Sequence, residues 1–402
     1  MSADVDLFIE HPNNLSFDLG SMDIRQHYRL VDAPLTRTTV GIARMVTSKP
    51  DLSSDWDWSK SWEENKLLGA LPSNDLLWLA RLATAIFVIP GLYFFYLSLK
   101  EVSANAYIPI LGIILLASNP LILLHTRRAM AEALLFFTVC LNMWLMTRKN
   151  NAPYSLAAGA ALAFSAKQTA AVYLISNLWI LIKQTIKSIK GRTYFFRSII
   201  GYLITLSIII FLLNPVAWFN PRLAIAAAIE ARTATIQAQT NLFEQVAPGL
   251  VLDDFGERLS ALLANQYYLQ PAIADVPNYV EDTQSQSESY FSQKIHRNDN
   301  SLVFGSIQLI LVIFGMILAI FEQLRYRNNY QLTTNFIILT IFQFIFLMIF
   351  LRFPFQRYVI PLIPLNIFWC TLALDRLIDR VVLVTTRKRG IYVAKKLDGN
   401  AL

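Results

Sequence analysis

Residues 125–146 read HTRRAMAEALLFFTVCLNMWLM, so two arginines and a glutamate stand at the start of an otherwise apolar run. A run of this kind is typical of a transmembrane helix. A charged side chain within such a helix costs roughly 2.5–3.5 kcal/mol on insertion scales, and its presence is by default functional. Arg127, Arg128 and Glu132 therefore predict a binding or catalytic site near one end of a membrane helix.

The composition of the whole chain is that of a polytopic membrane protein. Of its 402 residues, 55% are hydrophobic and 16% are charged. The formal net charge is +7, but Lys and Arg gather in short segments beside apolar runs, the distribution that orients membrane helices. Nucleic acid is therefore not an expected partner. Cys140 and Cys370 each lie inside an apolar run, which argues against a disulfide framework and against a cysteine metal site.

Most of the apolar runs approach the roughly 20 residues that a helix needs to cross the hydrocarbon core. They are residues 79–99, 107–124, 129–146, 153–182, 198–213, 302–321, 335–351 and 358–374. The run 153–182 is too long for one crossing and holds Lys167 near its middle. If it folds as a hairpin with Lys167 at the outer turn, every basic segment becomes cytoplasmic, as the positive-inside rule requires. We therefore expect this hairpin and about nine transmembrane helices.

The same charge pattern divides the chain into five parts. They are an extracytoplasmic first loop with amphipathic helices (1–78), a transmembrane core with phosphate-binding motifs (79–214), a large extracytoplasmic loop (215–301), C-terminal transmembrane helices (302–374) and a basic cytoplasmic tail (375–402). Residues 1–78 contain no signal peptide that would carry them across. The pattern therefore predicts that an original first transmembrane helix is missing; the alternative is that this polar segment crosses the membrane unaided.

The predicted topology brings several basic side chains from different helices to the outer membrane face. They are His125, Arg127, Arg128, Lys167, Arg352 and Arg357. Such groups suit a phosphate or pyrophosphate headgroup, because Arg binds phosphate through two hydrogen bonds and Lys acts as a point charge. The alternative is that they reach toward lipid headgroups or pair with Glu132 and with loop carboxylates.

Chemistry on a phosphate-linked substrate at this face would need a carboxylate as a base and a cation beside the departing phosphate. The carboxylates placed outside the membrane are Asp4, Asp6, Glu10, Asp18, Asp23, Asp32, Asp253 and Asp254. Sequence spacing does not choose among them. The chain contains no P-loop, HExxH or CxxC motif and its four histidines lie far apart, so no metal or other cofactor is expected, and a divalent ion has no ligand cluster to support it.

Five short segments carry a resemblance to a known family. They are YRLVDAPL at 28–35, LARL at 79–82, Asn119-Pro120 leading into HTRRAMAE at 125–132, AFSAKQTA at 163–170 and RYVIPLIP at 357–364. In this order and spacing they resemble the GT-C membrane glycosyltransferases. The most similar group is the protein O-mannosyltransferase and aminoarabinose-transferase-like enzymes, which use polyprenyl-phosphate sugars. The resemblance covers about residues 25–375.

The resemblance implies an all-α, GT-C-like polytopic enzyme of the bacterial inner membrane with its active site on the outer face. It would transfer a sugar from a polyprenyl- or dolichyl-phosphate donor to an acceptor, with inversion of configuration. The donor and membrane lipids are the implied partners, and neither the sugar nor the acceptor is identified. Residues carried over as holders of the lipid phosphate are Arg127, Arg128, Lys167 and Arg357, with His125, Glu132 and Tyr358 in support.

The chain departs from the family at its start. The family places an acidic pair directly after its first helix as the catalytic base, and neither that helix nor the pair is present here. Asp32 is the nearest remaining carboxylate and becomes the expected base. Two alternatives stay open: a catalytically incomplete partner subunit, and a lipid-linked oligosaccharide transporter or polymerase. A transporter would place polar residues along a path at mid-membrane rather than at one face.

Overall fold

The computed structural model describes residues 4–20, 24–57, 60–103, 105–148, 152–186, 191–274, 283–293, 302–325 and 331–398, and only the backbone of residues 24, 191, 331 and 381–398. The chain is 80% helical, and these residues contain no strand, which confirms the all-α class. Four of the basic residues beside the apolar runs lie outside the described residues: Lys149, Lys187, Lys190 and Arg327. Asp23, one of the candidate carboxylates, also lies outside them.

Eighteen α-helices follow one another along the described chain. Those outside the apolar runs are α1 (Asp4–Glu10), α2 (Ile24–Val31), α3 (Pro34–Val46), α4 (Trp62–Leu67), α13 (Pro221–Val246), α14 (Phe255–Leu263) and α15 (Gln284–Ser292). Those of the apolar runs are α5 (Asn74–Ala85), α6 (Val88–Lys100), α7 (Ile108–Ala117), α8 (Pro120–His125), α9 (Glu132–Thr147), α10 (Pro153–Ala166), α11 (Val172–Ile186), α12 (Gly191–Leu213), α16 (Leu302–Arg325), α17 (Gln331–Phe350) and α18 (Ile363–Asp398). A 3₁₀ segment, η7 (Gln356–Leu362), leads into α18.

Six helical segments among the described residues are long and apolar enough to cross a membrane. They are Asn74–Lys100, Gln168–Ile186, Arg192–Leu213, Leu302–Arg325, Leu332–Phe350 and Gln356–Arg380. Two further apolar helices, α7 and α9, are shorter. The structure is thus compatible with a multi-pass membrane protein, and the number of nine crossings stays a prediction.

The apolar run 107–124, expected as one helix, is divided in two. Helix α7 ends at Ala117, and α8 begins at Pro120. The Asn119 side chain accepts hydrogen bonds from the backbone N–H groups of Leu121 and Ile122, so it caps α8. Pro120 takes the first helical position, where its missing N–H costs nothing. The expectation of a single helix over this run was therefore wrong.

The run 153–182 breaks at Lys167, where the hairpin prediction places the turn. Helix α10 ends at Ala166, and Lys167 has an extended backbone with φ −164° and ψ 138°. A 3₁₀ turn at Gln168–Ala170 then leads into α11. Helices α10 and α11 pack against each other, and both contact α12.

A buried polar network holds α9, α10 and α11 together. Asn177 donates hydrogen bonds through Nδ2 to the Asn142 side-chain oxygen at 2.7 Å and to the Leu156 carbonyl at 2.9 Å. Asn142 donates in turn to the carbonyls of Thr138 and Gly159 at 2.7 and 2.8 Å. Interhelical amide bonds of this kind supply specificity where both helices and lipid are apolar.

Close helix contact also depends on glycine at the crossing of α16 and α18. A Cβ added at Gly315 would stand 2.2 Å from the carbonyl oxygen of Trp369. Small residues let helix backbones approach in this way. At Gly249, in the 3₁₀ segment η4 (Pro248–Leu250), an added Cβ would meet nothing within 4 Å.

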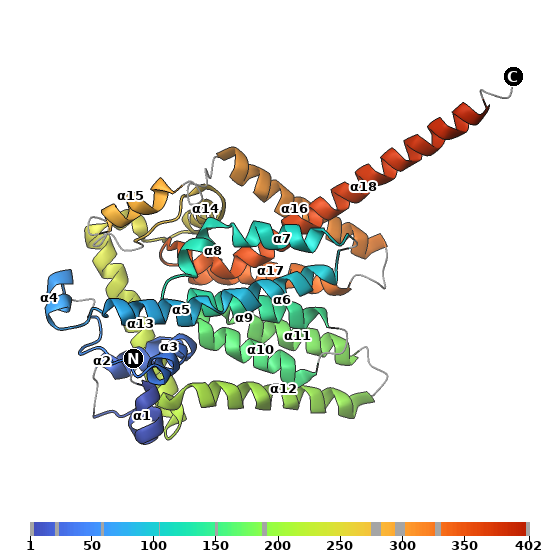
Figure 1. The fold of residues 1–402 in the computed structure, drawn as a ribbon. Coiled ribbons are helices and arrows are strands. Elements are labelled where there is room, and N and C mark those ends of the chain that lie inside the picture. Colours follow the sequence, from blue (N-terminus) through green and yellow to red (C-terminus); the bar gives the residue numbers. More distant parts are fainter. Residues whose placement is uncertain are drawn as a thin grey trace.

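Figure 1 shows α6, α9, α10, α11, α12 and α17 lying roughly parallel in one bundle. Helices α1 to α4, α13 and α15 gather at one end of that bundle, and α18 runs out beyond the opposite end (Figure 1). Helices from the segments 1–78 and 215–301 therefore share an end. The membrane face toward which this end points stays a prediction.

Candidate functional site

A buried ion pair joins Lys167 to Glu132, two of the residues singled out by their sequence motifs. Lys167 Nζ lies 2.6 Å from Glu132 Oε1 and donates a hydrogen bond to it. The Glu132 side chain is 1% exposed and that of Lys167 is 15% exposed. Glu132 is the first residue of α9, where a carboxylate is favoured by the helix dipole, and the break after α10 brings Lys167 beside it.

The Arg-Tyr pair of η7 packs against this ion pair. Lys167 Nζ lies 5.1 Å from the centre of the Tyr358 ring. The guanidinium carbon of Arg357 lies 5.8 Å from the same ring and 5.3 Å from the ring of Phe355. A cation over an aromatic face is attracted by the ring quadrupole. Tyr358 therefore has a lysine and an arginine beside one ring.

His125 is the buried member of this group. Its side chain is inaccessible to solvent, and neither ring nitrogen has a hydrogen-bond partner among the described residues. Burial, together with the charges of Arg128, Lys167 and Arg357, lowers the pKa of His125 to about 3, although the charge of Glu132 acts in the opposite direction. His125 is therefore neutral near pH 7. We call His125, Glu132, Lys167, Arg357 and Tyr358 the inner cluster.

Asp32 lies next to the inner cluster, at the end of α2. The Gln168 side chain, next to Lys167 in the chain, donates a hydrogen bond to the carbonyl of Val31 at 2.9 Å. The Asp32 side chain is exposed, yet desolvation by the surrounding protein raises its pKa. The carboxylate of Asp32 is therefore in contact with water, while nearby protein reduces its solvation.

Four cationic or titratable groups act on Asp32 from different elements and partly offset this rise in its pKa. They are Arg37, Arg232, His27 and Arg357. Arg357 also acts electrostatically on Glu132 and on His125. The arginine of η7 is thus the group that links Asp32 to the inner cluster.

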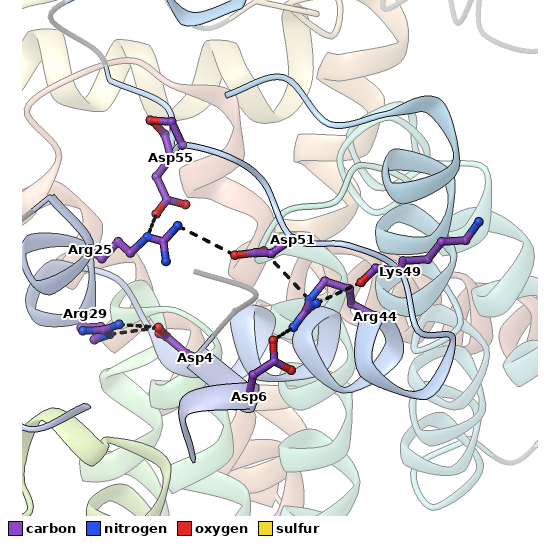
Figure 2. Close-up of polar contacts among 9 residues, drawn as sticks. Asp4, Asp6, Arg25, Arg29, Arg44, Lys49, Asp51 and Asp55 are labelled. Carbon is purple, nitrogen blue, oxygen red and sulfur yellow. Dashed lines mark hydrogen bonds and ion pairs between the residues drawn. The ribbon is translucent and has the colours of Figure 1, made fainter. Parts of the chain in front are cut away.

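Most of the other candidate carboxylates form ion pairs or hydrogen bonds outside the inner cluster. Figure 2 shows Asp4 beside Arg29, at 2.8 Å, and Asp6 beside Arg44. Further along the same network, Arg25 lies 2.9 Å from Asp55 and 3.9 Å from Asp51. These pairs tie α1 and the segment before α4 to α2 and α3.

In the large loop, Asp254 caps α14 by accepting a hydrogen bond from the Glu257 N–H at 2.8 Å, and Asp253 lies 4.0 Å from Arg352. Asp18 accepts a hydrogen bond from the Gly20 N–H. Glu10 and Asp32 then remain as the carboxylates of that set whose side chains form no ion pair or hydrogen bond with the described residues. Of these two, Asp32 is the one on which Arg357 acts.

The side chains of Arg127 and Arg128 contact the large loop. The guanidinium carbon of Arg127 lies 4.5 Å from the centre of the Tyr290 ring of α15, and the side chain borders an open surface hollow of about 470 Å³. Arg128 Nη2 donates a hydrogen bond to the carbonyl of Ile273 at 2.6 Å. Of the four predicted phosphate holders, Lys167 and Arg357 thus lie against the Tyr358 ring, whereas Arg127 and Arg128 reach the large loop, with the charge of Arg128 also acting on His125.

Sequence reasoning gave no role to Tyr290, Arg232 or Gln168. Gln168 lies in the motif AFSAKQTA, directly after Lys167, and this position was the signal that could have identified it. Tyr290 and Arg232 lie in the large loop, where no sequence pattern distinguishes them. Among the described residues, no three His, Cys, Asp or Glu side chains lie close enough together to hold a metal ion.

Comparisons with protein-family models, with curated proteins and with solved structures found no match. Any assignment of function therefore depends on the geometry of the inner cluster and Asp32, together with the motif resemblance.

Proposed function

We propose that the chain is a glycosyltransferase that moves a sugar from a polyprenyl-phosphate donor to an acceptor at the α1–α4 end of the bundle. The observation that supports it is that Lys167 and Arg357 share the Tyr358 ring, while Arg357 acts electrostatically on the water-facing Asp32. A cationic pair beside an accessible carboxylate is what transfer from a phosphate leaving group requires.

In the proposed reaction, Arg357 and Lys167 donate hydrogen bonds to the phosphate of the donor lipid. An ammonium group has three N–H donors, and Glu132 accepts one of them, so two remain for phosphate oxygens. Glu132 fixes the direction of the lysine side chain. The bidentate fork of Arg357 suits the phosphate as well.

Asp32 would accept the proton of the acceptor hydroxyl as the hydroxyl oxygen bonds to the anomeric carbon. The bond between that carbon and the phosphate oxygen breaks, and the phosphate leaves with the bonding electrons and the developing charge beside Lys167 and Arg357. Attack opposite the leaving group inverts the configuration. A raised pKa suits this role, because a base works best when its pKa lies nearer the working pH.

Donor-lipid transfer tests the proposal. The purified chain is incubated with radiolabelled polyprenyl-phosphate mannose, glucose or aminoarabinose, and with a membrane extract as the source of acceptor. We expect Asp32→Asn to lower transfer by about 10²- to 10⁴-fold, the usual contribution of a general base. Glu10→Gln is the matched control, because Glu10 is also exposed and forms no described ion pair.

Equal transfer by Asp32→Asn and by the unmutated chain would contradict the role of Asp32. If Arg357→Gln also transferred label normally, the phosphate site would be placed elsewhere. Failure of the unmutated chain with every donor would favour the partner-subunit alternative.

A further inference from the structure

Helix α12 presents most of its surface to the surroundings of the bundle. Only 11% of its most apolar stretch is buried inside the protein, compared with 28–89% in the other five candidate spans. In a membrane this surface would lie against lipid. The first turns of α12 lie at the end of the bundle opposite α1 to α3 (Figure 1).

A groove of about 780 Å³ runs along these first turns, between α12 and the start of α10. Its apolar wall consists of Phe196, Ile200 and Ile204, which are all exposed. Tyr154 of α10 closes the other side, and it approaches so closely that a Cβ added at Gly201 would stand 3.2 Å from its ring. The groove is therefore shaped by the packing of two helices.

The polar end of the groove is cationic. Arg192 and Arg197 line it, both side chains are exposed, and neither forms an ion pair with a described residue. The guanidinium carbon of Arg192 lies 5.5 Å from the centre of the Phe196 ring. The cationic end of the groove therefore adjoins its apolar wall. The described residues that line the groove include no acidic side chain.

We propose that this groove binds an anionic phospholipid. Its phosphate lies between Arg192 and Arg197, and one acyl chain follows Phe196, Ile200 and Ile204 along α12. Basic residues at a membrane surface attract anionic lipids, and arginine binds phosphate oxygens through two hydrogen bonds. A zwitterionic lipid suits the groove less well, because the described residues that line it offer no carboxylate to its ammonium group. The inference does not depend on the proposed transferase activity.

The test uses the purified full chain in a neutral detergent and native mass spectrometry with dioctanoyl phosphatidylglycerol or dioctanoyl phosphatidylcholine. We expect phosphatidylglycerol to bind at least about tenfold more tightly than phosphatidylcholine. The double variant Arg192→Gln/Arg197→Gln should lose at least about tenfold of that affinity, because it removes two charge-assisted contacts. Its melting temperature without added lipid should match that of the unmutated chain, because both side chains are exposed.

Arg222→Gln is the control, because Arg222 is an exposed arginine of α13 at the other end of the bundle. It should bind both lipids like the unmutated chain. Glycerol 3-phosphate should not displace phosphatidylglycerol, because it lacks the acyl chains. Equal binding of the two lipids, unchanged binding by the double variant, or displacement by glycerol 3-phosphate would each overturn the proposal.

Discussion

Replacing Lys167 and replacing Glu132 should lower the free energy of unfolding by different amounts, although each breaks the same ion pair. Lys167→Met leaves a carboxylate that is 1% exposed, and we expect it to lower the free energy of unfolding by about 3 kcal/mol. This is the low end of the range for a broken buried pair, because Arg357 also acts on Glu132. Glu132→Gln leaves a lysine that reaches water, and the expected loss is about 1.5 kcal/mol.

The double variant Glu132→Gln/Lys167→Met leaves no uncompensated charge, so its expected loss is about 2 kcal/mol. The two single losses add to about 4.5 kcal/mol, and the coupling between the residues is therefore about 2.5 kcal/mol. The assay is unfolding in mixed micelles with increasing dodecyl sulfate, followed by tryptophan fluorescence, for all four proteins. The exposed pair Lys49–Asp75, at 2.8 Å, is the control.

The Lys49 and Asp75 side chains are 38% and 75% exposed, so water and salt screen their attraction and their coupling should be close to zero. A coupling this small at Lys167–Glu132 would refute the interpretation of a buried, mutually dependent pair. The double variant Glu132→Gln/Lys167→Met also separates the effect on stability from the effect on sugar transfer. It should recover stability relative to Lys167→Met and still fail to transfer sugar, because the ammonium group is gone.

Four further perturbations test the packing of the helices and the titration of Asp32 and His125. Gly315→Ala should lower the free energy of unfolding by about 1–3 kcal/mol, because the new methyl group meets a backbone carbonyl, whereas Gly249→Ala should leave the melting temperature unchanged. Asn177→Leu should cost about 2 kcal/mol, measured in the same way, since it leaves buried acceptors without a donor; an unchanged melting temperature would contradict the network. The pKa of Asp32 is raised above 3.8, so the folded state binds that proton more tightly than the unfolded state, and this contribution to stability is lost as the pH rises through the raised pKa. Asp32→Asn should therefore not lower the melting temperature at pH 7, and a clear decrease would contradict the assignment. For His125, whose pKa is lowered to about 3, stability should fall as the pH drops below about 6.5, and His125→Asn should flatten that decline in melting temperatures measured between pH 7 and pH 4.

The fold class followed from composition and hydropathy, because apolar runs of membrane length leave few alternatives to helices. Positive charge on either side of the run 153–182 was enough to predict a break near Lys167. The break at Asn119-Pro120 was missed, although its signal was present: an N-cap residue followed by proline marks the start of a new helix. The mean hydropathy of the run 107–124 hides this signal, because two polar or helix-breaking residues change the average little.

Less of the candidate site than of the fold could be predicted from the sequence, because the contacts of the site join distant parts of the chain. Lys167 and Glu132 are 35 residues apart, and their pairing depends on how α9 and α10 pack. Pairing with Glu132 was one of two alternatives that the sequence left open for Lys167, and the structure contains it. The contact of Arg127 with Tyr290 had no signal at all, because nothing in residues 215–301 indicates where α15 lies.

The two carboxylates near Arg357 differ in a way that bears on their roles. Glu132 is inside the protein, and its Oε1 already accepts a hydrogen bond from Lys167. It can hold the ammonium group in place, but an acceptor hydroxyl in water cannot reach it without opening the site. Asp32 faces water and has no ion pair among the described residues, so it is free to take a proton. If sugar transfer occurs here, Glu132 should therefore position the lysine while Asp32 acts as the base.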